Sequence, residues 1–264
     1  MATAKRYRLD RFLSVTTGTP KRSVRALLAQ GRVTVDGETA TDINQQIDPF
    51  SLISLDGTEL QNRARRYILL HKPVGVVSAT KDDIHPTVID VLRQAGFPES
   101  ELGDLHIAGR LDLNSSGLLL LTNDSDWSEA LMAPDKKVAK VYEVTLKNPI
   151  SDECIKAFKE GIYFPFEDIT TKPAKLERLT PNTARVTLTE GKYHQIKRMF
   201  GRFRNPVLKL HRVAIGDIRL GATLECGHYR ELPCPRQPII SELHKHCGLK
   251  PEKPTSLTSV VPPE

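Results

Sequence analysis

Cysteine is scarce in this chain, with four residues among 264: Cys154, Cys226, Cys234 and Cys247. Four scattered cysteines cannot supply the disulfide framework of a small secreted domain, so reduced thiols in a cytosolic protein are the simplest interpretation. Long apolar runs are also missing, which argues against a helix that spans a bilayer. The first ten residues lack an apolar segment, so we expect no secretory signal. These absences favour a soluble, cytoplasmic protein.

Acidic residues are missing from one stretch, residues 191–212, which holds seven cations and no carboxylate. A concentrated basic stretch favours a polyanionic partner, most commonly nucleic acid, and the alternative is a solvated helix face. The chain as a whole has a formal net charge of +6 and 39% hydrophobic residues, which is enough apolar material for a folded core. The seven cations are Lys192, Lys197, Arg198, Arg202, Arg204, Lys209 and Arg212.

Residues 1–60 have the pattern of a small αβ module. Apolar residues at helical spacing over residues 9–13 predict a first amphipathic helix. A second helix is expected to be capped by Thr19 and to have Pro20 at its first position. Residues 33–37 end in Asp-Gly, which predicts a strand that enters a tight hairpin. So small a core makes the exposed basic residues of the second helix candidates for binding.

A larger unit is expected after this module. We expect a linker at residues 61–66, a domain at residues 67–235 and a partly disordered tail at residues 236–264. Strands in runs with irregularly placed helices indicate an α+β domain with a mostly antiparallel or mixed sheet and flanking helices, not a regular βαβ alternation. The expected strands cover residues 67–70, 74–77, 118–121, 138–146, 183–188 and 207–215, and the helices cover residues 88–94, 126–132, 152–160 and 193–200.

The stretch Gly109–Gly117 holds a single carboxylate, Asp112, shortly before the apolar run Leu118–Leu121. The run is short, continuous and followed by turn residues, which is typical of a buried strand. Functional groups gather on loops beside such strands, because the rigid element holds the loop in place. Asp112 is therefore a candidate catalytic group, and the alternative is a loop cap without chemistry.

Two later segments offer partners for this acid. In Lys140–Leu146 the alternating pattern places Tyr142 on a face with apolar residues, where a tyrosine is more often part of the core than functional. In residues 190–200 the apolar residues repeat at helical spacing, and Lys197 and Arg198 lie beside that stripe. One of these two cations could reach a neighbouring site.

The N-terminal pattern resembles the S4 RNA-binding module over about residues 6–56. The resemblance rests on Arg8–Leu13, on the basic second helix and on Gly31–Gly37. In that family the second helix and the turn after it contact RNA. The resemblance implies RNA contacts for Arg8, Arg11, Lys21, Arg22 and Arg25; the alternative is that these cations only keep a small domain soluble.

The Asp112 loop, the Tyr142 strand and the Lys197 helix, in this order and spacing, resemble the pseudouridine synthases of the RsuA/RluB type. Residues 71–75 and the S4-like module extend the resemblance to about residues 6–233. Two departures are visible, because His71 and Asn114–Ser116 stand where other members often have Asn and an Asp-Thr-Thr type of triplet. Neither affects the carboxylate. Residues 85–88, 126–128 and 168–174 are most similar to RsuA, which acts on small-subunit ribosomal RNA.

The resemblance implies a role for each residue of the site. Asp112 would be the catalytic group, acting as a nucleophile at the sugar carbon or as a base on a sugar hydrogen. Lys197 would pair with Asp112 and fix its direction, and Tyr142 would stack on the target base. Arg110 would occupy the space that the flipped uridine leaves. No cofactor is implied, since the reaction involves no redox change. Further RNA contacts would come from Lys192 and Arg198.

The implied activity is conversion of one uridine of ribosomal RNA to pseudouridine, with uridine 516 of small-subunit (16S) RNA as the expected target. The alternatives are a large-subunit (23S) enzyme of the RluB, RluE or RluF type and a non-catalytic S4-type assembly factor. We expect a monomer that binds ribosomal RNA within a small-subunit assembly intermediate and contacts no membrane. A zinc site at Cys226, His228, Cys234 and residues 244–247 is a further alternative, disfavoured because the spacing lacks the paired Cys-x-x-Cys pattern.

Overall fold

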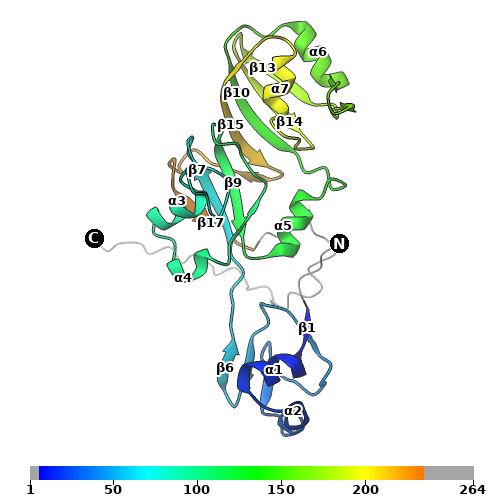
Figure 1. The fold of residues 1–264 in the computed structure, drawn as a ribbon, viewed down its shortest axis with the longest axis vertical. Helices are drawn as coiled ribbons and strands as arrows, with labels where there is room; N and C mark the ends of the chain where they lie inside the picture. Colours follow the sequence, from blue (N-terminus) through cyan, green and yellow to red (C-terminus); the bar gives the residue numbers. More distant parts are fainter. Residues whose placement is uncertain (1–5, 235–264) are drawn as a thin grey trace, which may run out of the picture.

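The computed structural model describes residues 6–234, and Figure 1 shows two parts joined by an extended segment. A small N-terminal module lies at one end, and a larger domain built on a nine-stranded sheet makes up the rest. The tail expected at residues 236–264 lies outside the described residues. Within the part of the chain that the structure describes, no helix is long and apolar enough to cross a membrane.

The N-terminal module contains both expected helices, α1 (Leu9–Thr17) and α2 (Lys21–Ala29). Their apolar faces bury Leu13 and Leu28 against a four-stranded sheet with the strand order β3-β2-β5-β6. A separate pair, β1 with β4, closes the module. The strands are β1 (Tyr7–Arg8), β2 (Val33–Val35), β3 (Glu38–Thr39), β4 (Gln46–Ile47), β5 (Ile53–Leu55) and β6 (Thr58–Gln61).

The structure agrees with the predicted hairpin turn of this module but not with the predicted cap of its second helix. The Asp-Gly turn is present, with φ of 53° at Asp36 and 85° at Gly37, which is the left-handed geometry of a two-residue hairpin. The expected cap at Thr19 is wrong. Pro20 is the residue that precedes the first helical residue of α2, and no side chain caps this helix. The Thr19 hydroxyl instead accepts a hydrogen bond from the hydroxyl of Thr17 at 2.7 Å.

The larger domain has one mixed sheet with the strand order β13-β14-β10-β15-β9-β7-β17. Two further strands extend it, because β8 pairs with β9 and β16 pairs with β15. Only the pair of β9 and β15 is parallel among the described strands, so the expected mostly antiparallel α+β fold is confirmed. The strands are β7 (Tyr67–Lys72), β8 (His106–Ala108), β9 (Ser116–Thr122), β10 (Lys140–Leu146), β13 (Lys175–Thr180), β14 (Thr183–Leu188), β15 (Val207–Ile215), β16 (Ile218–Arg219) and β17 (Tyr229–Glu231), and a hairpin of β11 (Tyr163–Phe164) and β12 (Ile169–Thr170) lies outside the sheet. The helices are α3 (Val88–Gln94), α4 (Glu99–Leu102), α5 (Ser125–Met132), α6 (Asp152–Glu160) and α7 (Gln195–Gly201).

Apolar clusters cover both faces of β9, which explains its unbroken run of leucines. Leu119 and Leu121 belong to the large cluster that includes residues of α3 and α7. Leu118 and Leu120 belong to a second cluster with Trp127 of α5. A strand that is buried on both faces needs apolar side chains at every position, and not at alternate ones.

Two expected elements are wrong or shifted. Residues 74–77 form a turn and not a strand: Gly75 has φ of 82°, and Val77 makes only an isolated bridge to Thr87. The helix expected from residue 193 begins at Gln195, because His194 has φ of 48° and lies outside the right-handed helical region.

Arginines of the segment between β6 and β7 connect the two parts. Arg65 forms ion pairs with Asp48 of the N-terminal module at 3.1 Å and with Asp124 of the larger domain at 3.3 Å. Its guanidinium also stacks on Phe50, 4.4 Å from the ring centroid. The segment is therefore held by contacts to both parts.

Candidate active site

The loop that carries Asp112 lies between β8 and β9, and a buried arginine of β15 holds its first half. Arg212 is 1% exposed and donates to the backbone carbonyls of Gly109 at 2.8 Å and Arg110 at 3.3 Å. It also donates to the carbonyl of Leu118 at 2.8 Å. Because β15 runs parallel to β9, the arginine lies directly beside the loop that enters β9.

A buried lysine of β7, the strand on the other side of β9, holds the second half of the loop. Lys72 is fully buried and donates to the carbonyls of Asp112 at 3.2 Å and Ser115 at 2.8 Å, and to that of Pro73 at 2.9 Å. Burial lowers the pKa of Lys72 to about 8, and the nearby Asp112 opposes that shift. Three acceptors compensate a cation that would otherwise be costly to bury.

The turn at residues 73–78 completes this support. The Ser78 hydroxyl donates to the carbonyl of Leu111 at 2.7 Å, and the amide of Leu111 donates to the same hydroxyl at 3.0 Å. The amide of Gly75 donates to the carbonyl of Leu113 at 2.9 Å. The backbone on either side of Asp112 is thus fixed by the protein, and its carboxylate is preorganised.

The carboxylate of Asp112 faces an ammonium group from α7 and the imidazole of the residue before this helix. Lys197 Nζ lies 3.1 Å from Oδ2, and His194 Nε2 lies 3.5 Å from Oδ1. The side chain of Asp112 remains 29% exposed, so a substrate can reach it. The strained backbone of His194 directs its ring to the acid, and Tyr193 stacks on that ring at a centroid distance of 3.9 Å.

Asp112 lines a cavity of about 710 Å³, a size typical of small-molecule sites. Tyr142 is buried in its wall, and the Arg212 guanidinium lies 6.0 Å from the centroid of the tyrosine ring. Lys140 lies on the same face of β10 as Tyr142. The predicted residues Arg110 and Lys192 line the cavity as well.

The structure therefore brings together the three residues that the motifs single out, Asp112, Tyr142 and Lys197. Arg198, predicted to contact RNA, is instead paired with Glu167 and stacked over Phe164 at 4.1 Å. Sequence reasoning placed Arg212 only in the basic stretch that favours a polyanion and Lys72 only in residues 71–75 of the resemblance, and it did not predict that either supports the loop. The one hint in the sequence was that Lys72 ends the apolar strand β7 and Arg212 lies within β15, a strand that alternates apolar and polar residues.

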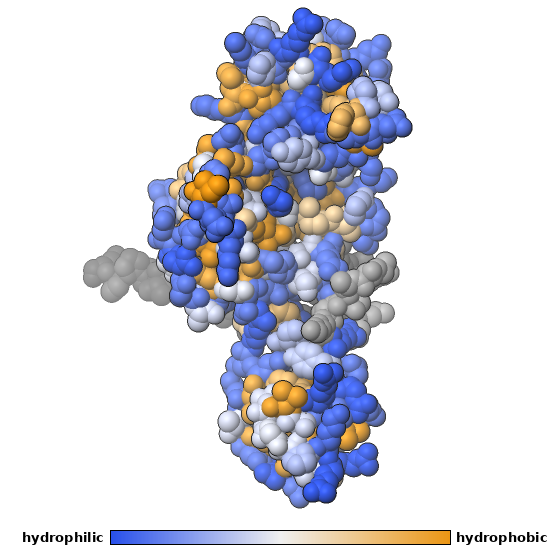
Figure 2. All heavy atoms as spheres, viewed as in Figure 1, coloured by the Kyte–Doolittle hydropathy of each residue, from blue (hydrophilic) through white to orange (hydrophobic). Residues whose placement is uncertain are grey.

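The predicted RNA contacts of the N-terminal module are solvent-exposed. The side chains of Arg11, Lys21, Arg22 and Arg25 are exposed and form no hydrogen bond or ion pair with residues 6–234. Arg8 is exposed too, but it pairs with Asp10, with contacts of 3.0 and 2.7 Å. Hydrophilic side chains cover much of the visible face of this module (Figure 2).

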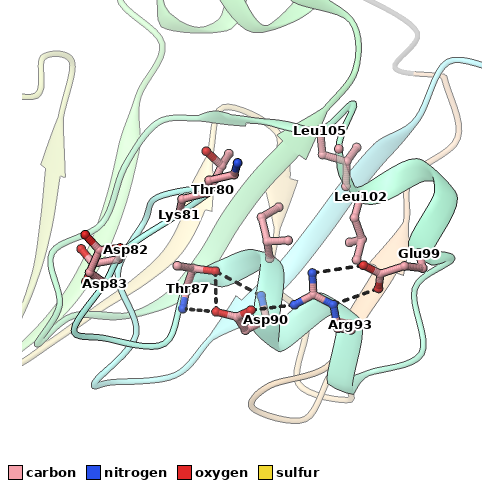
Figure 3. Close-up of a pocket in the computed structure, with 12 residues that line it drawn as sticks. Thr80, Lys81, Asp82, Asp83, Thr87, Asp90, Arg93, Glu99, Leu102 and Leu105 are labelled. Carbon is pink, nitrogen blue, oxygen red and sulfur yellow. Dashed lines mark hydrogen bonds and ion pairs between the residues drawn. The ribbon is translucent and has the colours of Figure 1, made fainter.

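A second cavity, of about 580 Å³, lies between residues 80–83 and helices α3 and α4 (Figure 3). Three of its charged groups form one network, because Arg93 bridges Asp90 at 2.6 Å and Glu99 at 2.8 Å. Asp90 also closes the capping box of α3 with Thr87. The network links α3 to α4 and stabilises both helices.

The zinc alternative concerned Cys226, His228, Cys234 and residues 244–247. Residues 244–247 lie outside the described part. Among residues 6–234, no three His, Cys, Asp or Glu side chains gather in a way that could hold a metal ion.

Comparison with known families and relatives gives matches over both parts of the fold. Residues 66–201 match the profile of RNA pseudouridylate synthases, and residues 8–53 match that of the S4 domain. The ribosomal small subunit pseudouridine synthase A of Pseudomonas aeruginosa is 48% identical over 226 residues, which are 85% of this chain and 96% of that protein. The protein of the same name from Escherichia coli is 40% identical, with the same coverage of both chains.

A solved structure shares the fold. The crystal structure of a pseudouridylate synthase is 37% identical in sequence and superposes with a TM-score of 0.61. The match covers 86% of this chain and 96% of that chain. The similarity therefore extends over nearly the whole length of the relatives.

Proposed function

The chain belongs to the RNA pseudouridylate synthase family, and on that premise we propose that it isomerises a uridine of small-subunit ribosomal RNA with Asp112 as the catalytic group. One observation carries the assignment: a single carboxylate on an immobilised loop lies 3.1 Å from an ammonium group in a cavity with a buried tyrosine. A binding protein without catalysis would have no need to hold a partly exposed acid in this way.

The reaction conserves every atom. The bond between the ribose C1′ and uracil N1 breaks, the uracil turns, and C5 forms the new bond to C1′. The C5 proton is lost and N1 gains one, so no oxidant or reductant is needed. The carboxylate of Asp112 serves either as the nucleophile at C1′ or as the base for a ribose hydrogen, and both routes need it ionised and directed at the sugar.

The neighbouring side chains have distinct roles in this proposal. Lys197 stabilises the ionised carboxylate and fixes its direction. Tyr142 stacks on the uracil after it leaves the RNA helix, and Arg110 fills the space that it vacates. Lys192 contributes a phosphate contact at the edge of the cavity, and Arg198 does so only if it releases Glu167.

The proposed target is uridine 516 of 16S ribosomal RNA, within a small-subunit assembly intermediate in the cytoplasm. The relatives named for the small subunit support this subunit over the large-subunit alternative. A monomer would bind the RNA through its N-terminal module, with the exposed cations of α2 on phosphates. The boundaries proposed for the two domains remain residues 1–60 and 67–235, joined by residues 61–66.

Replacing Asp112 with Asn tests the catalytic assignment. We expect pseudouridine formation to fall at least about 10³-fold, which corresponds to about 4 kcal/mol, while RNA affinity stays within about threefold. Asp152→Asn is the matched control, because Asp152 is exposed on α6 and does not line the cavity. Turnover that survives in Asp112→Asn would contradict the assignment.

Mapping pseudouridine in ribosomal RNA from cells that lack this protein tests the target. Loss of the modification at uridine 516 alone is the expected result. Loss in the large subunit instead would favour the alternative enzyme type, and no loss at all would favour the non-catalytic assembly factor.

A further inference from the structure

Three cationic side chains are buried around the Asp112 loop, and one of them lacks an acceptor. Lys72, Lys140 and Arg212 are 0%, 7% and 1% exposed. Lys72 and Arg212 each donate to three backbone carbonyls. The side chain of Lys140 has neither a hydrogen bond nor an ion pair with any residue of the described range 6–234.

The surroundings of Lys140 explain why the protein itself offers no acceptor. It begins β10, and its partners in register on the two neighbouring strands are Leu188 and Ile215, both apolar and buried. Burial lowers the pKa of Lys140, and the charge of Arg212 lowers it further. Its ammonium keeps contact with solvent, and a cation that is largely desolvated and has no counter-charge is suited to an anion that binds from outside.

The accessible side of Lys140 is the cavity that Asp112 and Tyr142 also line. Lys140 and Tyr142 share a face of β10 and are two residues apart, which separates their Cα atoms by about 7 Å. A nucleotide whose base stacks on Tyr142 can present its backbone at that separation. The strong anion that RNA supplies there is a phosphodiester oxygen, and a lysine ammonium is a suitable point charge for it.

We propose that Lys140 binds the phosphodiester next to the target uridine and so anchors the flipped nucleotide in the cavity. The inference rests on the proposed function and deepens it, since it names the part of the substrate that this buried cation recognises. Lys140 is a substrate-binding residue in this account, and the chemistry stays with Asp112.

The first experiment compares Lys140→Met and Lys140→Arg with the wild type on a small-subunit ribosomal RNA fragment that contains the target uridine. We expect kcat/KM to fall about 10- to 100-fold in Lys140→Met, because one charge-assisted contact is lost, and to recover partly in Lys140→Arg. Lys159→Met is the matched control, because Lys159 is exposed on α6 and lies outside the cavity lining. Activity of Lys140→Met equal to that of the wild type would overturn the proposal.

The second experiment identifies the atom that Lys140 contacts. RNA fragments with one neutral methylphosphonate, placed 5′ or 3′ of the target uridine, are compared in both enzymes. At one of the two positions the methylphosphonate should lower the kcat/KM of the wild type about as much as the Lys140→Met substitution does. At that position it should not lower the kcat/KM of Lys140→Met any further. A methylphosphonate that harms both enzymes equally at both positions would overturn the phosphate assignment and point to a uracil carbonyl.

Thermal unfolding separates this role from a structural one. Removing a largely desolvated charge that has no partner in the protein should leave the melting temperature of Lys140→Met unchanged or higher. A lower melting temperature would show that Lys140 stabilises the fold and would contradict the proposal. A wild type that makes no pseudouridine on unmodified RNA would instead refute the proposed function, so the two failures are distinguishable.

Discussion

The N-terminal module and the larger domain use the same kind of side chain in opposite ways. On α2 the cations Lys21, Arg22 and Arg25 are exposed, and their side chains form no hydrogen bond or ion pair with residues 6–234. Around the Asp112 loop, Lys72 and Arg212 are buried, and each donates to three backbone carbonyls. The first group is arranged for a partner that comes from solution, and the second is arranged for the protein itself.

This difference predicts how each group responds to change. Exposed cations act on a polyanion mainly through charge, so their effects are small, nearly additive and weakened by salt. Buried cations act through the atoms that they hold, so each is specific to its position and expensive to remove. Four measurements test this contrast, in order of decreasing expected effect.

Arg212→Met should lower the free energy of unfolding by about 3 kcal/mol, because three buried carbonyls lose their donor. Denaturant titration measures the change. Arg185→Met is the control: Arg185 is exposed on β14 and pairs with Glu143 at 3.2 Å, and its loss should cost no more than about 1 kcal/mol. Similar losses in both variants would remove the distinction between buried and exposed cations.

Lys197→Met should lower kcat about 100-fold, or about 2.7 kcal/mol, because the carboxylate of Asp112 loses the group that fixes its direction. Single-turnover kinetics on a ribosomal RNA fragment measures the effect. The KM should change less than about threefold if the lysine acts on the acid and not on the RNA. Lys197→Arg should restore part of the rate, since it keeps the charge, and a rise in KM alone would assign Lys197 to RNA binding.

The stability of the wild type relative to Lys72→Met should increase between about pH 8 and pH 10.5. Burial lowers the pKa of Lys72 from 10.5 to about 8, so in this range the unfolded chain binds a proton that the folded protein lacks. Stability rises with pH wherever the unfolded state holds more protons. Denaturant titrations of both proteins across this range measure the difference, and a constant difference would show that Lys72 keeps its ordinary pKa.

Arg22→Gln should have the smallest effect. We expect kcat to stay unchanged, and the slope of log affinity against log salt concentration to decrease in magnitude by about 0.7 to 0.9. Arg32→Gln is a control in the same module, because Arg32 already pairs with Asp56 at 2.8 and 2.5 Å and should change the slope less. Salt dependence that is identical in wild type and Arg22→Gln would exclude this residue from the interface.

Local sequence signals predicted the elements of the site but not their support. The period of α7 places Lys197 beside the buried stripe, and the alternation of β10 places Tyr142 on the inner face. The backbone of His194 gave no such signal, because a left-handed φ at a non-glycine residue depends on its surroundings. Residues 74–77 appeared strand-like from composition, yet Gly75 turns the chain to donate to the Asp112 loop.

Gly117 shows why the rest could not be predicted. A Cβ on this residue would lie 2.3 Å from the carbonyl oxygen of Arg212, so only glycine allows β9 and β15 to pair there. The two residues are separated by almost a hundred positions in the chain, and no local pattern encodes their approach. The glycine at position 117 indicates that the backbone there lacks room for a side chain. Only the folded protein shows that the Arg212 carbonyl takes that room.

The sequence alone determined six of the seven described helices, five strands of the large sheet, the hairpin turn and the set of residues that can perform the chemistry, because these depend on neighbours within a few positions. The tertiary structure decided which cations are buried and what each one holds. The strand order brings Lys72, Lys140 and Arg212 around one loop. Because these side chains are buried, the role of each cation depends on the hydrogen-bond acceptors within its reach. For Lys72 and Arg212 those acceptors are backbone carbonyls of other segments. Every residue has a backbone carbonyl, so the amino-acid sequence does not indicate which carbonyls these cations will contact.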